Sequence, residues 1–292
     1  MLSQIEEFVN YIRRRNAQAR TWRDYRGDLR QFAAVVGDCA PGAVTFRDVD
    51  RFVARQQERG FKPATVNRRL AAILAFYAYL ADEDQNLVCP ILPRRHYLRE
   101  PQRLPRPVQE EALWAFFTAI EAEPTLRTRD RAMFLLMLRC GLRIGEVAGL
   151  LLTDLFLDEP APRMLVHGKG SRERVVYLSR QAERALRLHL AERPASLESE
   201  AVFLSYQGKG MSTTAIHYRL RRYRQRANVY LTAHRLRHSF ANDLLSAGAP
   251  VTSIQQLLGH RWLETTQIYV AANDQQVQAD YYAACAKLEG WL

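Results

Sequence analysis

The sequence predicts a mainly α-helical protein of two domains, with a small antiparallel β-sheet or hairpin in the second domain. Three observations lead to this prediction. The chain has 292 residues, which is more than one ordinary domain needs and enough for two separate cores. Apolar residues recur at helical spacing along most of the chain. Between residues 163 and 178 the period changes to two, which is typical of strands.

The predicted N-terminal domain, residues 1–88, consists of helices. Apolar stripes and the breaks between them predict helices from Ser3 to about residue 12, and over 20–36, 46–58 and 63–80. Ser3 can cap the first helix, and Pro63 suits the first turn of the fourth. Polar side chains near the start of the fourth helix form either a solvated face or contacts to nucleic-acid phosphate. These residues are Lys62, Asn67, Arg68 and Arg69.

Residues 89–107 are predicted to form an extended linker. Prolines alternate there with arginines at a density that forbids a continuous helix. A basic linker can cross DNA, although a plain surface linker explains the same pattern nearly as well. The candidate DNA contacts in this segment are Arg94, Arg95, Arg103 and Arg106.

The second domain, residues 108–292, should open with two helices and a turn. A helix over about 108–122 precedes one over 127–140, which is apolar almost all round and therefore buried. Gly141 ends that helix, and another helix is expected over 143–152. Strands over 164–166 and 174–178 then flank a glycine-rich, basic tip, which predicts a β-hairpin.

The rest of this domain is again predicted to be helical, apart from one short strand. A capping box at Thr252 and Gln255 and a stop at Gly259 bound one of these helices. The expected elements are helices over 180–192, 212–226, 234–245, 251–258 and about 274–289, and a strand over 202–205.

The composition favours an acidic partner. A net charge of +11 and a pI near 9.8 are typical of proteins that bind nucleic acid, with a membrane surface as the alternative. No run approaches the roughly 18 apolar residues of a membrane span, and the N-terminus lacks a signal pattern, so we expect a cytoplasmic protein. The four cysteines form no C-x-x-C pair, which argues against a disulfide framework or a zinc finger.

A cluster of arginine and histidine carries the clearest chemistry. His234, Arg237 and His238 are spaced to share one helix face. Two imidazoles at this spacing could hold a metal, but Arg235 stands where a zinc protease needs its glutamate, so we expect no metal. Guanidinium and imidazole groups suit a phosphate, which arginine binds through two hydrogen bonds. The same reasoning does not single out Tyr269, which reads as an ordinary packing residue.

A series of motifs resembles the tyrosine recombinase (phage integrase) family, and its Xer-like members most of all. The resemblance spans essentially the whole chain and implies a two-domain DNA clamp of the tyrosine recombinase type. The motifs are, in order, Gly141-Leu142-Arg143-Ile144-Gly145-Glu146, Gly168-Lys169-Gly170, His234-Arg235-Leu236-Arg237-His238, Leu258-Gly259-His260 and Tyr269.

The resemblance implies a role for each matching residue and no cofactor. Tyr269 would attack a DNA phosphodiester and become linked to the 3′ phosphate, while Arg143 and Arg237 clamp the non-bridging oxygens. Lys169 would protonate the leaving 5′ oxygen, with simple phosphate contact as the alternative. The supporting roles are proton transfer near the tyrosine for His234, a hydrogen bond to the phosphate for His260, orientation of its neighbours for Glu146, and packing or catalysis for His238.

The implied partner is a double-stranded recombination site, held by a homo-tetramer alone or together with a related recombinase. The C-terminal helix would pack on a neighbouring protomer or on its own domain. The reaction would serve integration and excision of a mobile element or resolution of DNA multimers. Two other classes stay open from the sequence: a DNA-relaxing enzyme of the type IB topoisomerase kind, and a non-catalytic DNA-binding accessory protein.

Overall fold

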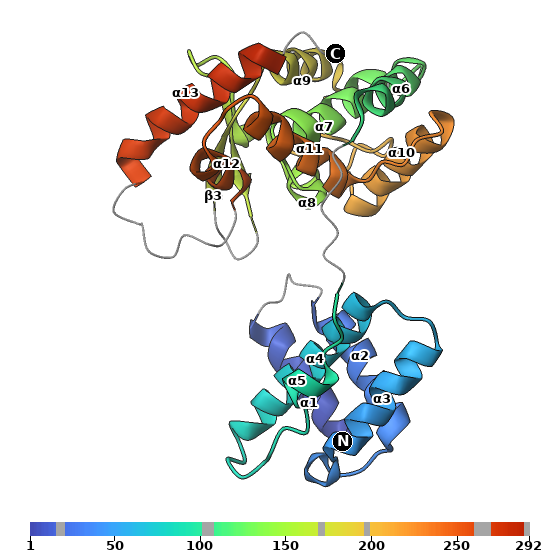
Figure 1. Ribbon diagram of the computed structural model, residues 1–292. Helices are drawn as coiled ribbons and strands as arrows, with labels where there is room; N and C mark the ends of the chain where they lie inside the picture. Colours follow the sequence, from blue (N-terminus) through green and yellow to red (C-terminus); the bar gives the residue numbers. More distant parts are fainter. Residues whose placement is uncertain (16–20, 101–107, 169–172, 196–198, 260–269, 289–292) are drawn as a thin grey trace. The chain divides into compact units, whose positions relative to one another are not determined.

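The computed structural model describes residues 1–15, 21–100, 108–168, 173–195, 199–259 and 270–288. The chain divides into two compact units, Met1–Leu104 and Pro105–Leu292, which are shown in Figure 1. Described residues of both units are predominantly helical, and a three-stranded antiparallel sheet lies in the second unit. The fold class predicted from the sequence is therefore confirmed.

The N-terminal unit packs its helices around α4. The apolar stripe of α4 is buried against α1, α2 and α3, and Leu70 and Ile73 are fully inaccessible. Ser3 lies inside α1 and donates its hydroxyl to Glu7 at 3.0 Å, so its predicted role as a cap is wrong. The helices of this unit are α1 Leu2–Arg15, α2 Thr21–Val36, α3 Phe46–Glu58, α4 Pro63–Ala81 and α5 Pro93–His96, with a 3-10 turn at Pro41–Ala43.

The segment 89–100 packs on this unit and is not the extended linker that its prolines predict. Pro93 begins the short helix α5, and Ile91 is buried in the core. Asn67 fixes the chain that follows: its side chain accepts from the N–H of Leu98 at 2.8 Å and donates to the Leu98 carbonyl at 2.9 Å. Apolar residues between the prolines explain the difference, because they give the segment surface to bury.

The second unit is built around α7. This helix packs against α6, α9 and α11, and Met133 and Leu136 are completely buried in it, which confirms the predicted buried helix. The helices of this unit are α6 Glu110–Glu121, α7 Arg127–Arg139, α8 Ile144–Ala148, α9 Arg180–Glu192, α10 Thr213–Arg226, α11 Ala233–Ser246, α12 Val251–Leu258 and α13 Val270–Leu288.

The sheet has the strand order β1-β2-β3, with β1 Leu155–Phe156, β2 Arg163–His167 and β3 Glu173–Tyr177. The strands β2 and β3 pair antiparallel, with His167 opposite Glu173 at the end next to the tip, so the predicted hairpin pairing is confirmed. The strand predicted over 202–205 is wrong. Around them there are only isolated bridges, which pair Leu151 with Ala201 and Leu204 with Gly210.

Two helix boundaries differ from the predicted ones for local reasons. The helix expected over 143–152 stops early as α8, because the Leu150 carbonyl and the Leu152 N–H bond the backbone of residues 200–202 instead. The helix α12 begins after Pro250, and no side-chain cap forms there, so the capping box predicted for Thr252 and Gln255 is wrong. Its predicted end is confirmed, since Gly259 is left-handed with φ of 63°.

The C-terminal helix α13 docks on its own domain. It packs against α11 and α12. Tyr281 is fully buried and donates its hydroxyl to the carbonyl of Arg139 at 2.8 Å. The hydroxyl of Ser253, on α12, donates to Asp280 at 2.6 Å. The segment that follows Tyr269 is thus anchored to the end of α7 and to α12.

Gly141 allows α7 to end against α11. Its φ is +67°, and a Cβ at this position would lie 2.5 Å from a ring carbon of buried Phe240. Replacing Gly141 with alanine is expected to destabilise this unit by roughly 2–5 kcal/mol, through left-handed strain and overpacking. Denaturant unfolding followed by circular dichroism measures the loss. Gly145→Ala is the control, because nothing lies within 4 Å of that added carbon; equal stability of the two variants would contradict the prediction.

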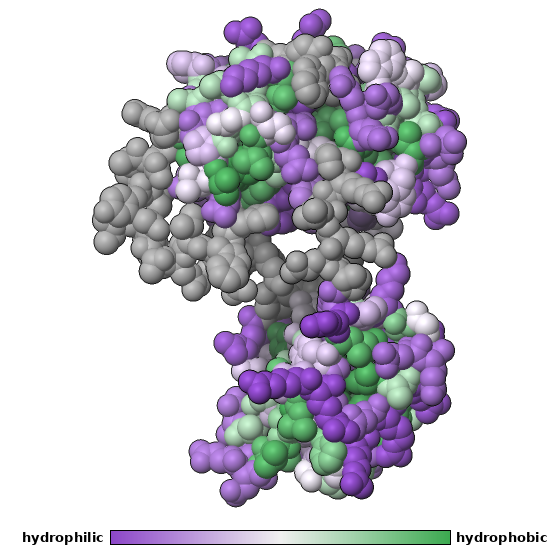
Figure 2. All heavy atoms as spheres, viewed as in Figure 1, coloured by the Kyte–Doolittle hydropathy of each residue, from purple (hydrophilic) through white to green (hydrophobic). Residues whose placement is uncertain are grey.

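Figure 2 shows hydrophilic side chains interspersed with smaller hydrophobic areas over the visible face of each unit. Among the described residues, none of the helices combines the length and the apolar character that a membrane span requires.

Candidate active site

The turn between α7 and α8 presents Arg143. Arg143 is the N-cap of α8, and its backbone N–H donates to the carboxylate of Glu146 at 2.7 Å. A glutamate at the third helical position commonly accepts this hydrogen bond from the N-cap. The guanidinium of Arg143 also bonds Glu146, at 2.8 Å, yet the side chain stays 47% exposed. The backbone of Arg143, the predicted phosphate-binding residue, is therefore fixed, while its side chain remains accessible.

Glu146 brings three arginines together. Besides Arg143, it receives two hydrogen bonds of 2.8 Å from Arg174 on β3, and Arg237 on α11 lies 3.7 Å away. Burial by itself raises the pKa of Glu146, but the hydrogen bonds and charge of Arg174, with those of Arg143, outweigh burial and lower the pKa to about 2. Glu146 is thus ionised at any working pH, and its predicted role in orienting its neighbours is consistent with these contacts.

Arg237 is the buried member of the cluster. Its guanidinium donates to the carbonyl of Gly141 at 2.5 Å and to the carbonyl of Leu258 at 2.5 Å, so it joins the α7–α8 turn to the end of α12. Burial lowers the pKa of Arg237 to about 10; Arg143 and Arg174 also lower it, while Glu146 opposes them. The group remains a cation at neutral pH.

His234 and His238 lie on the same helix as Arg237. Thr232 caps α11 and accepts from the N–H of Arg235 at 3.2 Å, so His234 lies in the first turn. His234 is exposed and His238 is half-buried, and their ring centroids are 5.9 Å apart. The helix that the sequence predicts for these residues forms, and its spacing brings His234 to the same end of α11 as Arg237.

Three predicted catalytic residues, Lys169, His260 and Tyr269, lie outside the described residues. Arg103 and Arg106 of the predicted linker do so as well. Their roles stay predictions. In the sequence Lys169 follows β2 and precedes β3, while His260 directly follows the glycine that ends α12.

Sequence reasoning missed Arg174. The sequence predicts only a strand for this residue, which shares a strand face with buried Val176, two residues further on. A charged residue on the buried face of a strand needs a partner, and this signal could have identified it.

The predicted DNA contacts of the N-terminal unit differ in their surroundings. Asn67 bonds the backbone of residue 98 and Glu100. Arg69 is 6% exposed, stacks on Phe61 at 4.0 Å and bonds Gln56. The side chain of Asn67 is therefore bonded within the protein, and the guanidinium of Arg69 is buried.

The other four candidates are accessible to differing degrees. Lys62 and Arg94 are exposed, and the side chains of Arg68 and Arg95 are 49% and 53% exposed. Arg68 pairs with Asp28, and Arg95 pairs with Asp50. A phosphate that binds Arg68 or Arg95 would have to compete with these carboxylates.

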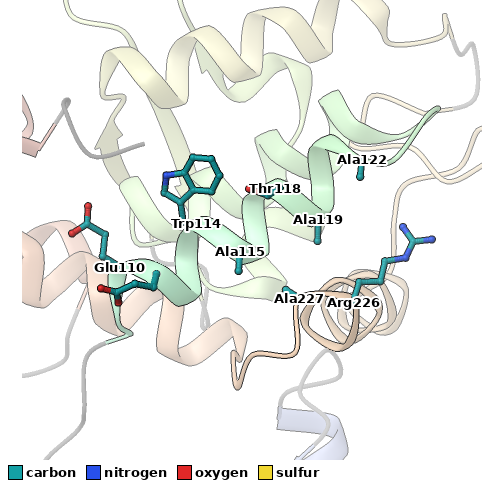
Figure 3. A pocket seen from close by; sticks show the side chains of 9 residues that line it. Glu110, Trp114, Ala115, Thr118, Ala119, Ala122, Arg226 and Ala227 are labelled. Carbon is teal, nitrogen blue, oxygen red and sulfur yellow. The ribbon is translucent and has the colours of Figure 1, made fainter.

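A shallow apolar pocket lies on the second unit, between α6 and the end of α10. Figure 3 shows Glu110 at one end and Arg226 at the other. It shares no lining residue with the arginine cluster, and we assign it no part in the chemistry. The residues between its ends include Trp114, Ala115, Thr118, Ala119, Ala122 and Ala227.

Each unit of the chain matches a known family model. The model of the phage integrase family matches residues 107–276, and that of the phage integrase N-terminal SAM-like domain matches residues 5–84. Tyrosine recombinase XerC of Pelotomaculum thermopropionicum is 33% identical, over 99% of this chain and 100% of the relative. Tyrosine recombinase XerA of Thermococcus kodakarensis is 33% identical, over 91% of this chain and 89% of the relative.

Solved structures share the fold. The XerH site-specific recombinase bound to its palindromic difH substrate, in a post-cleavage complex, superposes with a TM-score of 0.72 at 23% identity, covering 96% of this chain and 83% of the other. A lambda integrase dimer bound to a COC′ core site gives a TM-score of 0.71 at 16% identity, covering 92% and 98%.

Proposed function

The chain belongs to the phage integrase family, as a Xer-like tyrosine recombinase, and from this premise we propose that Tyr269 is the residue through which it cuts DNA. The protein is a site-specific DNA recombinase, and duplex DNA is its substrate. The full-length similarity to recombinases does not favour a relaxing enzyme or a non-catalytic accessory protein.

The observation that supports a phosphate site here is that Arg143 and Arg237 both lie against the carboxylate of Glu146. Two guanidinium groups from separate elements are held there by one ionised carboxylate, and such a pair can bind both non-bridging oxygens of a phosphodiester. Because these donors are fixed before the substrate arrives, they can stabilise the charge that develops on a pentacoordinate phosphorus.

In the proposed reaction, the phenol oxygen of Tyr269 forms a bond to phosphorus, and the bond from phosphorus to the 5′ oxygen breaks. His234 accepts the phenol proton, and Lys169 gives a proton to the leaving 5′ oxygen. His260 hydrogen-bonds the phosphate. The 3′-phosphotyrosine keeps the energy of the original bond, so a 5′ hydroxyl from a second duplex reverses the step and joins new strands.

We propose that a homo-tetramer carries out this exchange on two paired sites, either for integration and excision of a mobile element or for resolution of DNA multimers. The N-terminal unit, through Lys62, Arg68, Arg94 and Arg95, contacts the backbone of the same duplex. Because the substrate is duplex DNA, we infer a cytoplasmic enzyme.

The test begins with trapping. Protein incubated with fragmented genomic DNA is denatured, the covalently linked fragments are sequenced, and a nicked suicide duplex is built on the recovered site. We expect a denaturation-resistant adduct whose DNA-linked peptide contains Tyr269. A plasmid with two such sites should yield deletion products; relaxation of a plasmid that lacks the site, without such products, would support a relaxing enzyme instead.

Lys169→Ala is expected to slow cleavage of the ordinary suicide duplex by about 100- to 10,000-fold, the usual range for loss of a general acid. A duplex with sulfur at the 5′ bridging position needs no protonation of its leaving group. We therefore expect this substrate to restore cleavage by Lys169→Ala to near the wild-type rate. Without such a rescue, Lys169 would act as a phosphate contact and not as the acid.

A further inference from the structure

All three guanidinium nitrogens of Arg174 bond protein groups. Its two terminal nitrogens donate to the two oxygens of Glu146, each at 2.8 Å, and its Nε donates to the carbonyl of Leu257 at 2.8 Å. Its side chain is only 12% exposed, whereas that of Arg143 is 47% exposed. Glu146 occupies the two terminal nitrogens and the Leu257 carbonyl occupies Nε, so this guanidinium is arranged to hold protein parts together.

The carbonyl that Arg174 binds lies in the last turn of α12, where backbone acceptors lack helical partners. The next carbonyl, that of Leu258, receives Arg237 at 2.5 Å. A cation at a helix C-terminus is also favoured by the helix dipole. Two arginines that share Glu146 therefore cap the end of α12 side by side.

The chain turns at Gly259 directly against Arg174. A Cβ at Gly259 would lie 3.1 Å from Cδ of Arg174, and the φ of +63° at Gly259 sets the direction in which the chain leaves α12. In the sequence, this exit leads to His260 and on to Tyr269. The aliphatic part of the Arg174 side chain thus lies next to the residue that directly precedes, in the sequence, the segment with His260 and Tyr269.

We propose that Arg174 is a positioning residue that locks the Arg143 turn and the end of α12 into one frame through Glu146 and the Leu257 carbonyl. The inference rests on the proposed function of this site. Arg174 also belongs to β3, the strand that follows Lys169, so it joins the three segments to which the catalytic roles are assigned. Lysine cannot replace it, because one ammonium group cannot reach two carboxylate oxygens and a carbonyl in a single plane.

The test is single-turnover cleavage of the suicide duplex at saturating protein, so that chemistry is separated from binding. We expect Arg174→Lys to slow cleavage about 10- to 100-fold, the scale of a small misplacement of reacting groups, with the DNA dissociation constant unchanged within about twofold. The double variant Arg174→Lys/Glu146→Gln should lose less cleavage than the product of the two single losses, because Arg174 acts through Glu146, although Glu146 also holds Arg143 and Arg237. Independent, multiplying effects of the two changes would overturn the inference.

Arg129→Lys is a matched control. The side chain of Arg129 is 10% exposed, pairs with buried Asp130 and donates to the Leu204 carbonyl at 2.8 Å, much as Arg174 does. We expect it to lower the melting temperature as much as Arg174→Lys does and to leave cleavage by folded protein near the wild-type rate. Equal losses of cleavage in both variants, or wild-type cleavage by Arg174→Lys, would refute the positioning role.

Salt dependence distinguishes positioning from direct phosphate contact. Loss of one phosphate contact reduces the slope of log affinity against log salt by about 1, and we expect Arg174→Ala to leave that slope unchanged. A reduced slope would make Arg174 a DNA ligand and overturn the proposal. Failure of the proposed function looks different, because wild type and Arg129→Lys would then also form no adduct at Tyr269, and the inference would fall with it.

Discussion

Replacing Tyr269 with phenylalanine is expected to abolish the covalent protein–DNA adduct. The change removes one oxygen and keeps the aromatic ring, so only the nucleophile is lost. DNA affinity should stay within about twofold, because phosphate contacts by arginine and lysine supply most of it. Denaturing electrophoresis of protein incubated with end-labelled suicide duplex measures the adduct directly.

Tyr206→Phe is the control for this experiment, since the side chain of Tyr206 is 92% exposed in the same unit and belongs to no proposed catalytic group. It should form adduct at the wild-type rate. An adduct that persists in Tyr269→Phe would place the nucleophile at another residue and would remove the central assignment of the mechanism.

Replacing Arg237 with lysine is expected to slow cleavage by about 100- to 1,000-fold, the usual cost of losing one fixed donor to a developing oxyanion. Lysine keeps the charge, but it cannot bond the carbonyls of Gly141 and Leu258 and still present donors to a phosphate. Single-turnover cleavage with the site saturated measures the loss apart from DNA binding.

Arg139→Lys controls for the removal of a buried arginine. The side chains of Arg139 and Arg237 are each 7% exposed, and Arg139 pairs with Asp243. Both variants should be destabilised, because each leaves a carboxylate less well paired, half-buried Asp243 in one and buried Glu146 in the other. Only Arg237→Lys should lose cleavage when rates are compared at equal folded fraction. A wild-type rate for Arg237→Lys would exclude it from the phosphate clamp.

The sequence predicts helices best where local signals and burial agree. The bounds of α3 and α9 match their predictions, since a capping box opens α3 and Ser179 caps α9 by accepting from the N–H of Ala182. Predictions failed where distant backbone groups compete. The helix after Arg143 is cut short by bonds to residues 200–202. Residues 89–100 are held by contacts of Leu98 with Asn67 and of Arg95 with Asp50, which are 31 and 45 residues away.

The same division explains what could be predicted of the site. Arg143 with Glu146, and His234 with Arg237, are close in sequence, so helical spacing together with family resemblance found them. Arg174 meets Glu146 across 28 residues and Leu257 across 83. Such contacts depend on tertiary packing, and spacing along the chain contains no direct signal for them.

The cluster around Glu146 also carries a net positive charge. Three guanidinium groups share one carboxylate, which leaves two net positive charges among these four side chains. A phosphodiester carries one negative charge, whereas the pentacoordinate state carries two. The uncleaved substrate therefore leaves the cluster with an excess positive charge, and the transition state neutralises it. In the proposed reaction, attraction that grows as the transition state forms would lower the barrier without trapping the bound DNA, and the excess of arginine over glutamate would itself contribute to catalysis.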